Sequence, residues 1–342
     1  MKLVSIIIPA YNCEQDVRRC IDSLLKQTYK NIDITIYDDG STDSTAGICR
    51  KLSEDHSEVT FESVEHRGVA DVRNYGLKRA KGDYIMFVDS DDYVKESYVE
   101  HMVSAIEKDP ECDMAICSYD RIIYGGEYPI VSLIKPGIMS KNQYLIGTLE
   151  DPGHHYFGVL WNKIFKRNII IENGLEFQRN ISLGEDFVFS LNYLKYAKKV
   201  NVINDILYYY CYQTRDTLSR IQDKSISDCR SELSNRNKIF INYISAMKSS
   251  GLYNRYKKRI YDYWIVFLTR QKYSLITEYR WRPEDKKAWE REIVENSFIK
   301  KAISFYGQKE IAVKFFKYSI TQTVKNIAKK TVLFFRIRRQ EA

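Results

Sequence analysis

The chain has 342 residues, of which 44% are hydrophobic, and it contains 27 Tyr and 15 Phe. This composition excludes a disordered or collagen-like chain, and the length suits one large or two ordinary domains. The seven cysteines form no CxxC pair, which argues against a zinc ribbon and favours a reducing, cytoplasmic compartment. No apolar run approaches the ~18 residues of a membrane span, and Pro9 interrupts the N-terminal apolar stretch, so we expect neither a spanning helix nor a secretory signal.

The net charge of +8 is concentrated near the C-terminus. Residues 309–339 hold nine basic residues and one acidic residue, Glu310, which amounts to +8 (9 − 1). Apolar residues recur between them at roughly helical spacing, so the segment is predicted to be a basic amphipathic helix. It could dock on an anionic membrane or pack on the protein with its basic face in water. We expect peripheral contact with the membrane through 309–339 and no nucleic-acid partner, because no recognition motif accompanies the charge.

Apolar and amphipathic segments alternate over residues 1–120. The patterns predict strands over 3–9, 32–37, 59–64, 84–88 and 114–118. They predict helices that end near Lys26 and that span 42–52, 69–81 and 95–108. Asn12 and Gln15 have the spacing of a capping pair for the first helix. Such alternation is typical of an α/β fold with a mostly parallel sheet flanked by helices.

The rest of the chain changes from mixed structure to helix. Residues 119–180 are mixed, with a hairpin near Gly125 and Gly126, and a helix over 187–197 precedes short strands near 200–203 and 206–212. Helices are predicted over 223–249, 253–274, 284–304 and 309–338. We therefore expect an α/β domain over 1–222, a helical region over 223–308 and a basic tail over 309–342.

Clusters of acidic residues follow two of the predicted strands and open a helix. Asp89, Asp91 and Asp92 follow the strand 84–88 directly, and three carboxylates this close are tolerable if a hard cation such as Mg²⁺ or Mn²⁺ neutralises them. The same tract could be a solvated turn. Asp39 could accept hydrogen bonds from a nucleobase or simply belong to a tight turn before a helix. Residues 185–186 could be first-turn acids favoured by the helix dipole.

Four motifs occur in one order along the chain: SIIIPAYN at 5–12, DDGSTD at 38–43, VRNYGLKRAKGDYIMFVDSDD at 72–92 and GED at 184–186. Together they resemble the family 2 glycosyltransferases with the GT-A fold. The resemblance is strong over 1–120, moderate over 120–220 and weak or absent beyond about 225. It implies a nucleotide-binding half over 1–120 and an acceptor-side half over 121–222. Residues 69–72 read VADV, where small residues are commoner in the family.

The resemblance also implies roles for individual residues. Those expected at the nucleotide sugar are Pro9, Tyr11, Asp39, Arg73, Asp89 and Lys163. Those expected to bind Mn²⁺ or Mg²⁺ are Asp91 and Asp89, with Asp92 as a neighbour of undefined role. Asp186 resembles the catalytic base, and Glu185 a residue that positions the acceptor or sugar. The segment Trp161-Asn162-Lys163 resembles one that lines the sugar and acceptor side.

The implied function is that of an inverting, metal-dependent glycosyltransferase. It would move a hexose or N-acetylhexosamine from a UDP-sugar to a hydroxyl of a lipid-linked glycan in bacterial surface polysaccharide synthesis, at the inner face of the plasma membrane. A nucleotidyltransferase also uses an α/β sheet and acidic metal ligands, but the Gly-rich phosphate loop that it needs is absent from the sequence. A non-catalytic, membrane-associated UDP-sugar-binding protein is the other alternative.

Several further side chains have a functional and a structural interpretation. The histidines at 154–155 could contact the acceptor or lie in a polar loop, and the tyrosines at 208–210 could stack on a sugar or alternate in a strand. Arg215 and Ser219 could close over the donor diphosphate. The tryptophans at 264, 281 and 289 are expected to pack in the helical region.

Overall fold

The computed structural model describes residues 1–123, 125–150, 154–212, 226–262 and 295–307, together with the single residues 264, 284, 292 and 310. By its internal contacts the chain divides into two units. The first comprises residues 1–215 and 237–251, and the second comprises residues 216–236 and 252–342. The acidic motifs all belong to the first unit.

A mixed β-sheet forms the centre of the first unit, with the strand order β3-β2-β1-β4-β9-β6-β10-β5. Parallel pairing joins β3 to β2, β2 to β1, β1 to β4 and β6 to β10. The described strands are β1 Val4–Ala10, β2 Ile32–Asp38, β3 Val59–Ser63, β4 Tyr84–Phe87, β5 Tyr93–Val94, β6 Cys112–Ile123, β7 Gly126–Ile130, β8 Gly137–Ser140, β9 Lys163–Lys166 and β10 Lys199–Cys211. The predicted α/β class is confirmed.

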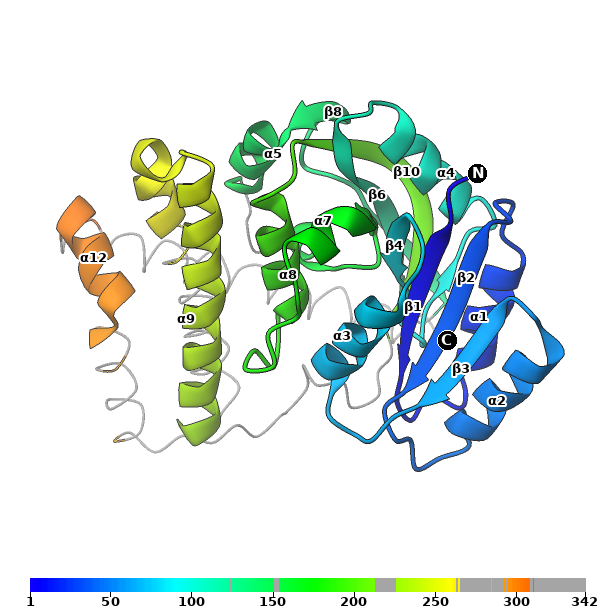
Figure 1. Cartoon of the computed structure of the whole chain (residues 1–342). Helices are drawn as coiled ribbons and strands as arrows, with labels where there is room; N and C mark the ends of the chain where they lie inside the picture. The colour runs from blue at the N-terminus through cyan, green and yellow to red at the C-terminus, as the bar shows by residue number, and fades with distance from the viewer. Residues whose placement is uncertain are drawn as a thin grey trace, which may run out of the picture. The chain divides into compact units, whose positions relative to one another are not determined.

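Helices cover both faces of this sheet. Figure 1 shows α1, α2 and α4 on one face and α3 and α8 on the other. The described helices of both units are α1 Val17–Leu25, α2 Thr45–Asp55, α3 Val69–Arg79, α4 Tyr98–Glu107, α5 Lys141–Thr148, α6 His155–Gly158, α7 Arg167–Glu172, α8 Glu185–Leu194, α9 Ile226–Ser249 and α12 Ser297–Tyr306. The sheet core consists of aliphatic side chains with no exposure, such as Ile6, Ile8 and Ile34.

The strands β5, β8 and β9 were not predicted, and β10 was predicted as two strands. The short strand β9 inserts antiparallel between β4 and β6 because Ile164 and Phe165 are fully buried there. The two strands predicted near 200–203 and 206–212 are one strand, β10, whose register shifts between Val202 and Ile206. The exposed residues at this bulge interrupt the apolar pattern, which made one strand look like two.

The capping pair predicted for α1 is wrong. The helix begins at Val17 with Asp16 as its N-cap, and no side chain caps it. Asn12 has a left-handed φ of 47°, and its side-chain Oδ1 accepts a hydrogen bond from the Thr42 amide at 2.9 Å. The Asn12 amide in turn donates to Ser41 Oγ at 2.9 Å. Asn12 therefore ties the loop after β1 to the loop after β2.

In the second unit, Trp264 is fully buried and its ring lies 5.4 Å from that of Phe298, which confirms its packing role. The helix predicted over 284–304 is interrupted at Asn296, whose side chain caps α12 by accepting from the Phe298 amide at 2.9 Å. The predicted helix 309–338, the loop with Arg215 and Ser219, and the tryptophans at 281 and 289 lie outside the described residues. Within the described part of the chain, no helix combines the length and apolar character needed to cross a membrane.

The approach of Gly82 to β1 sets a test of this packing. A Cβ at Gly82 would lie 2.6 Å from the Ser5 amide nitrogen and 2.8 Å from the Leu3 carbonyl oxygen, both backbone atoms that cannot give way cheaply. Gly82→Ala should lower the free energy of unfolding by about 1–3 kcal/mol in urea denaturation. The control Gly47→Ala lies in α2 with no atom within 4 Å of the new Cβ. It should stabilise the protein by about 0.5–1 kcal/mol, and equal midpoints for the two variants would contradict this account.

Candidate active site

The loops after β1 and β2 form one side of the candidate site. The pairing of β1 with β4 ends at Ile7. Pro9 lies beyond this point, where β1 no longer has to donate an amide hydrogen bond to β4, so a proline is tolerated in this central strand. Asp39 is only 4% exposed, and its two carboxylate oxygens accept from the amides of Arg67 at 2.9 Å and Gly68 at 3.0 Å. Asp39 thereby orients the loop that precedes α3.

That loop places an unpredicted residue, His66, beside Tyr11. The two rings stack with centroids 4.6 Å apart, and His66 Nδ1 lies 2.9 Å from Asp39 Oδ2. Tyr11 is 47% exposed, which is unusual for a large ring and leaves one face available to a ligand. Three residues from three loops, those after β1, β2 and β3, therefore form an accessible aromatic surface with a carboxylate at its edge.

The loop after β4 has the sequence DSDD at residues 89–92, and its three carboxylates lie in different environments. It is called the DSDD loop below. The side chain of Asp89 is 28% exposed, and Asp92 has no exposure. Asp92 accepts from Tyr208 Oη and from the Cys211 amide, each at 2.7 Å, so it anchors the end of β10. Burial, followed by the like charge of Asp89, raises the pKa of Asp91 to about 6. The role left undefined for Asp92 in the sequence is thus a structural one.

Arg73 joins the DSDD loop to the acids at the start of α8. The guanidinium is 4% exposed, and its Nη1 lies 2.9 Å from Glu185 Oε1 and 2.5 Å from Asp186 Oδ1. Its Nη2 lies 3.2 Å from Asp89 Oδ1. One cation faces three carboxyl groups, which leaves an excess of two negative charges when all three are ionised. The described ion pairs of Arg73 are with protein carboxylates, and its guanidinium also lies 5.6 Å from the centre of the Phe177 ring. Its contact with a nucleotide stays a prediction.

Burial dominates the ionisation of this cluster. It raises the pKa of Asp186 well above the ordinary range, and the charge of Arg73 acts in the opposite direction. The pKa of Asp89 is raised for the same reason and is lowered in part by Arg73. Because an unpaired buried carboxylate is costly, Arg73 is what allows these groups to share one site.

The loop that precedes Glu185 and Asp186 is supported by α9. Gly184 has a left-handed φ of 90°, and a Cβ there would lie 2.8 Å from the Ile239 side chain. Lys238 Nζ donates to the Asn180 carbonyl at 2.6 Å, and Gln178 lies within hydrogen-bond distance of α9. The start of α8 is therefore positioned by the segment 237–251, which is distant in sequence but belongs to the same unit.

Lys163 and Trp161 are buried beneath the site. The Lys163 ammonium has no exposure and donates to the Val159 carbonyl and to Asn162 Oδ1, the latter at 2.9 Å. Burial lowers its pKa to about 7. These contacts do not support a direct contact of Lys163 with a phosphate. The Trp161 ring stacks on Tyr208 at 4.2 Å, and so it packs against the residue that binds Asp92.

The donor groups available for a cation are few. Asp92 is fully engaged, which leaves Asp91 and the exposed part of Asp89 as oxygen ligands. Across the described residues there is no group of three or more His, Cys, Asp or Glu side chains arranged to hold a metal. Mg²⁺ is commonly held by one or two carboxylates, with water and substrate phosphates completing the shell. The two aspartates fit such an ion.

The match to known proteins extends this picture. A family model described as "Glycosyl transferase family 2" matches residues 5–174. Glycosyltransferase GlyG of Streptococcus pneumoniae serotype 4 is 30% identical over 251 residues, which cover 67% of this chain and 81% of that protein. The chain belongs to glycosyl transferase family 2. The resemblance found in the sequence motifs is thus confirmed.

Two other similar proteins bear on fold and function. S. aureus TarS 1-349, solved in complex with UDP-GlcNAc, has a TM-score of 0.69 at 18% identity and covers 94% of this chain and 92% of its own, which confirms the expected GT-A-type fold. The Escherichia coli enzyme WfaP, a UDP-Glc:alpha-D-GlcNAc-diphosphoundecaprenol beta-1,3-glucosyltransferase, is 45% identical over 107 residues, 31% of this family 2 chain and 42% of WfaP. The chain spans 32%, 64% and 65% of the length of three further curated relatives.

Removal of the Arg73 cation tests the central cluster. Arg73→Met should lower the free energy of unfolding by about 3–5 kcal/mol, because it leaves buried carboxylates uncompensated. The loss should be larger near about pH 8 than near about pH 5, since the variant raises the carboxyl pKa values further and protonation then removes the uncompensated charge.

Urea denaturation at the two pH values measures this difference. Arg79→Met is the control: its guanidinium is 44% exposed and pairs with Glu62 at 3.3 Å, so it should cost about 1 kcal/mol or less. Similar losses in the two variants would show that Arg73 does not hold the cluster together.

Proposed function

We propose that this chain is an inverting, metal-dependent glycosyltransferase that transfers a hexose or N-acetylhexosamine from a UDP-sugar to a hydroxyl of a lipid-linked glycan in bacterial surface polysaccharide synthesis. The observation that carries the proposal is the Arg73 cluster, which brings Asp89 to the Glu185-Asp186 pair. The name of WfaP gives a UDP-sugar donor, a diphosphoundecaprenol-linked acceptor and a β-linkage, which supports the proposed substrate classes. The enzyme would work at the inner face of the plasma membrane.

The nucleobase of the donor would bind at Tyr11 and His66. The uracil ring stacks on the exposed face of Tyr11, whose other neighbour is His66 at 4.6 Å. Asp39 Oδ1 accepts from one backbone amide and can accept a further hydrogen bond from the polar edge of the base, whereas Oδ2 already contacts the Gly68 amide and His66 Nδ1. Pro9 borders this pocket at the end of β1. TarS solved with UDP supports a uridine nucleotide as the ligand class.

The donor diphosphate would lie at the DSDD loop. Asp91 and Asp89 would hold Mn²⁺ or Mg²⁺, which neutralises the charge of the departing nucleoside diphosphate and so lowers the barrier to its release. The excess negative charge of the cluster stabilises positive charge that develops at the sugar C1. Asp92 contributes indirectly, since it fixes the loop to β10.

Asp186 would act as the general base. Burial raises its pKa, which makes its carboxylate a stronger proton acceptor than an exposed aspartate. Arg73 holds one oxygen of Asp186 and leaves the other for the acceptor hydroxyl, and Glu185 shares the same Nη1 and fixes the guanidinium. Attack from the face opposite the leaving group inverts the anomeric centre, so an α-linked donor gives a β-linked product.

Two substitutions test the proposed base and the proposed metal site independently. Asp186→Asn keeps the side-chain shape and should lower the turnover rate by about 10²–10⁴-fold, with UDP affinity retained. Asp91→Asn should instead weaken UDP binding in the presence of Mn²⁺ or Mg²⁺. Asp205→Asn, an exposed position with a side chain 48% accessible, is the control and should match the wild type in both measurements. Near-normal turnover of Asp186→Asn would rule out its assignment as the base.

The decisive assay measures UDP release. The full chain is offered UDP- and GDP-sugars with Mn²⁺, Mg²⁺ or EDTA, and with a bacterial membrane-lipid extract as the source of acceptor. Metal-dependent release of UDP from one donor is the expected result. Metal-dependent UDP binding without release from any donor would favour a binding protein, and release of pyrophosphate from a sugar phosphate and UTP would favour a nucleotidyltransferase. Absence of UDP binding would overturn the assignment of Tyr11, Asp39 and Asp91.

A further inference from the structure

An aromatic layer extends from the DSDD loop along the carboxyl ends of β6 and β10. The two strands are parallel, and their register places Tyr208 beside Tyr119 and Tyr210 beside Arg121. Because alternate residues of a strand face the same way, these four side chains share one face of the sheet. Trp161 lies over this face, stacked on Tyr208 at 4.2 Å and nearly parallel to Tyr210 at 5.5 Å.

The layer changes from buried to accessible along its length. Tyr208 has no exposure and Trp161 has 2%, whereas Tyr210 is half-buried and His155 is exposed. The rings of Tyr210 and His155 lie 5.4 Å apart. The buried stack therefore supports two rings that a ligand can reach.

Polar groups border these accessible rings. His155 Nδ1 and Tyr119 Oη share a hydrogen bond of 2.9 Å, which fixes the orientation of the imidazole. The second ring nitrogen, Nε2, can then form a hydrogen bond with a ligand. Arg121 lies 6.0 Å from the Tyr212 ring, and its buried Nε has no hydrogen-bond partner among the described residues. A buried donor without a partner is costly, so a ligand hydroxyl would be favourable at this position.

The layer is continuous with the proposed reaction centre. Tyr208 Oη donates to Asp92 Oδ2 at 2.7 Å and accepts from the Asp89 amide at 3.2 Å. Burial, together with the negative charges of the DSDD loop, raises the pKa of Tyr210 to about 12. Because Tyr210 lies two residues from Tyr208 on the same face of β10, a ligand on its ring would lie near the carboxylates that are proposed to hold the donor.

We propose that Tyr210, His155 and Arg121 form an acceptor subsite that binds a pyranose ring of the acceptor glycan, an inference that rests on the proposed glycosyl transfer. A pyranose has an apolar C–H face, which suits the accessible ring of Tyr210, and a rim of hydroxyls, which suits the guanidinium and the imidazole. The donor nucleobase has its own aromatic surface at Tyr11, so this second aromatic surface serves the other substrate.

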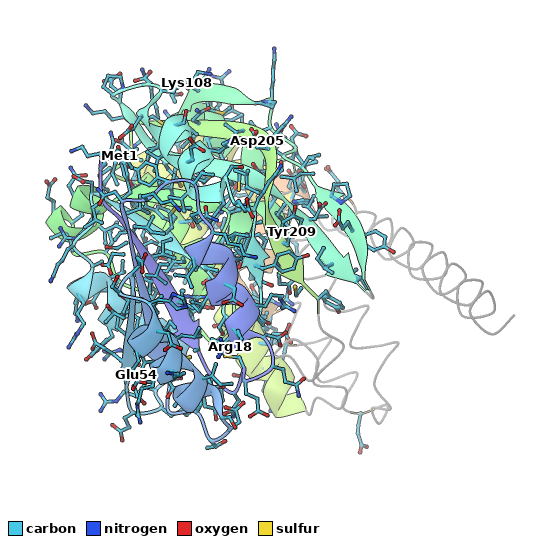
Figure 2. The ribbon with its side chains drawn as sticks, turned by 90° about the vertical axis from the view of Figure 1, so that its right-hand side faces the viewer. Met1, Arg18, Glu54, Lys108, Asp205 and Tyr209 are labelled. Carbon is cyan, nitrogen blue, oxygen red and sulfur yellow. The ribbon has the colours of Figure 1, made fainter. Side chains whose placement is uncertain are left out.

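Kinetics with the full chain test the subsite. Tyr210→Ala and the exposed-site variant His155→Ala should each lower kcat/KM for the membrane-lipid extract by about tenfold, through a raised KM, at saturating donor. The affinity for UDP and the slow rate at which the UDP-sugar is hydrolysed without an acceptor should stay at wild-type values. Tyr209, labelled in Figure 2, provides the matched control. It is one residue from Tyr210, so it points to the opposite face of the strand, and its ring stacks on Tyr93 at 4.6 Å. The KM of Tyr209→Ala for the membrane-lipid extract should equal that of the wild type.

A binding measurement separates this proposal from the proposed reaction. Saturation-transfer NMR with the methyl glycosides of glucose, galactose and N-acetylglucosamine should show transfer to at least one sugar in the wild type and in Tyr209→Ala, and loss of transfer in Tyr210→Ala. This result would support the subsite even if no donor were turned over. Absence of transfer in the wild type, equal effects of Tyr209→Ala and Tyr210→Ala, or a weakened UDP affinity in Tyr210→Ala would overturn it.

Discussion

The pairing of one buried guanidinium with three carboxylates is the constraint on which the rest of this structure depends. Arg73 comes from α3, Asp89 from the end of β4, and Glu185 and Asp186 from the start of α8. Without the cation the three acids could not remain buried together, and without the acids the guanidinium could not be buried. The two halves of the family 2 domain are thus joined at the point where chemistry would occur. The remaining negative charge makes the site receptive to a metal ion and to developing positive charge.

Around this cluster, two strands connect the proposed nucleotide site to the proposed acceptor subsite. The antiparallel strand β9 lies between β4 and β6 and brings Trp161 under the site. Asp92 holds the end of β10 through Tyr208 and the Cys211 amide. The same loop therefore carries Asp89 and Asp91, the proposed metal ligands, and fixes the end of β10. A shift of this loop would alter both surfaces together.

The sequence predicted the strands β1 to β4 and the helices between them closely, because each strand is a compact apolar run that ends in a turn. Short motifs also predicted site roles for Asp89, Asp91, Glu185 and Asp186. The structure brings Asp89, Glu185 and Asp186 together at Arg73, and the four roles stay predictions. The sequence did not predict β9, since four residues contain too little periodicity to distinguish a strand from a loop. The role of His66 and the partners of Arg73 could not be predicted from the sequence, for a different reason. Their roles come from contacts between residues far apart in the chain, which local patterns do not encode.

The support of α8 by α9 has a consequence for where the working domain ends. The resemblance to family 2 fades near residue 225, and the family model itself ends at 174. Yet Lys238 holds the Asn180 carbonyl, and Ile239 fills the space beside Gly184, one residue before Glu185. The segment 237–251 therefore belongs to the same unit as the proposed base, although the sequence motifs do not mark it. A boundary drawn from the motifs alone would separate the proposed base from Lys238 and Ile239, which support the residues just before it.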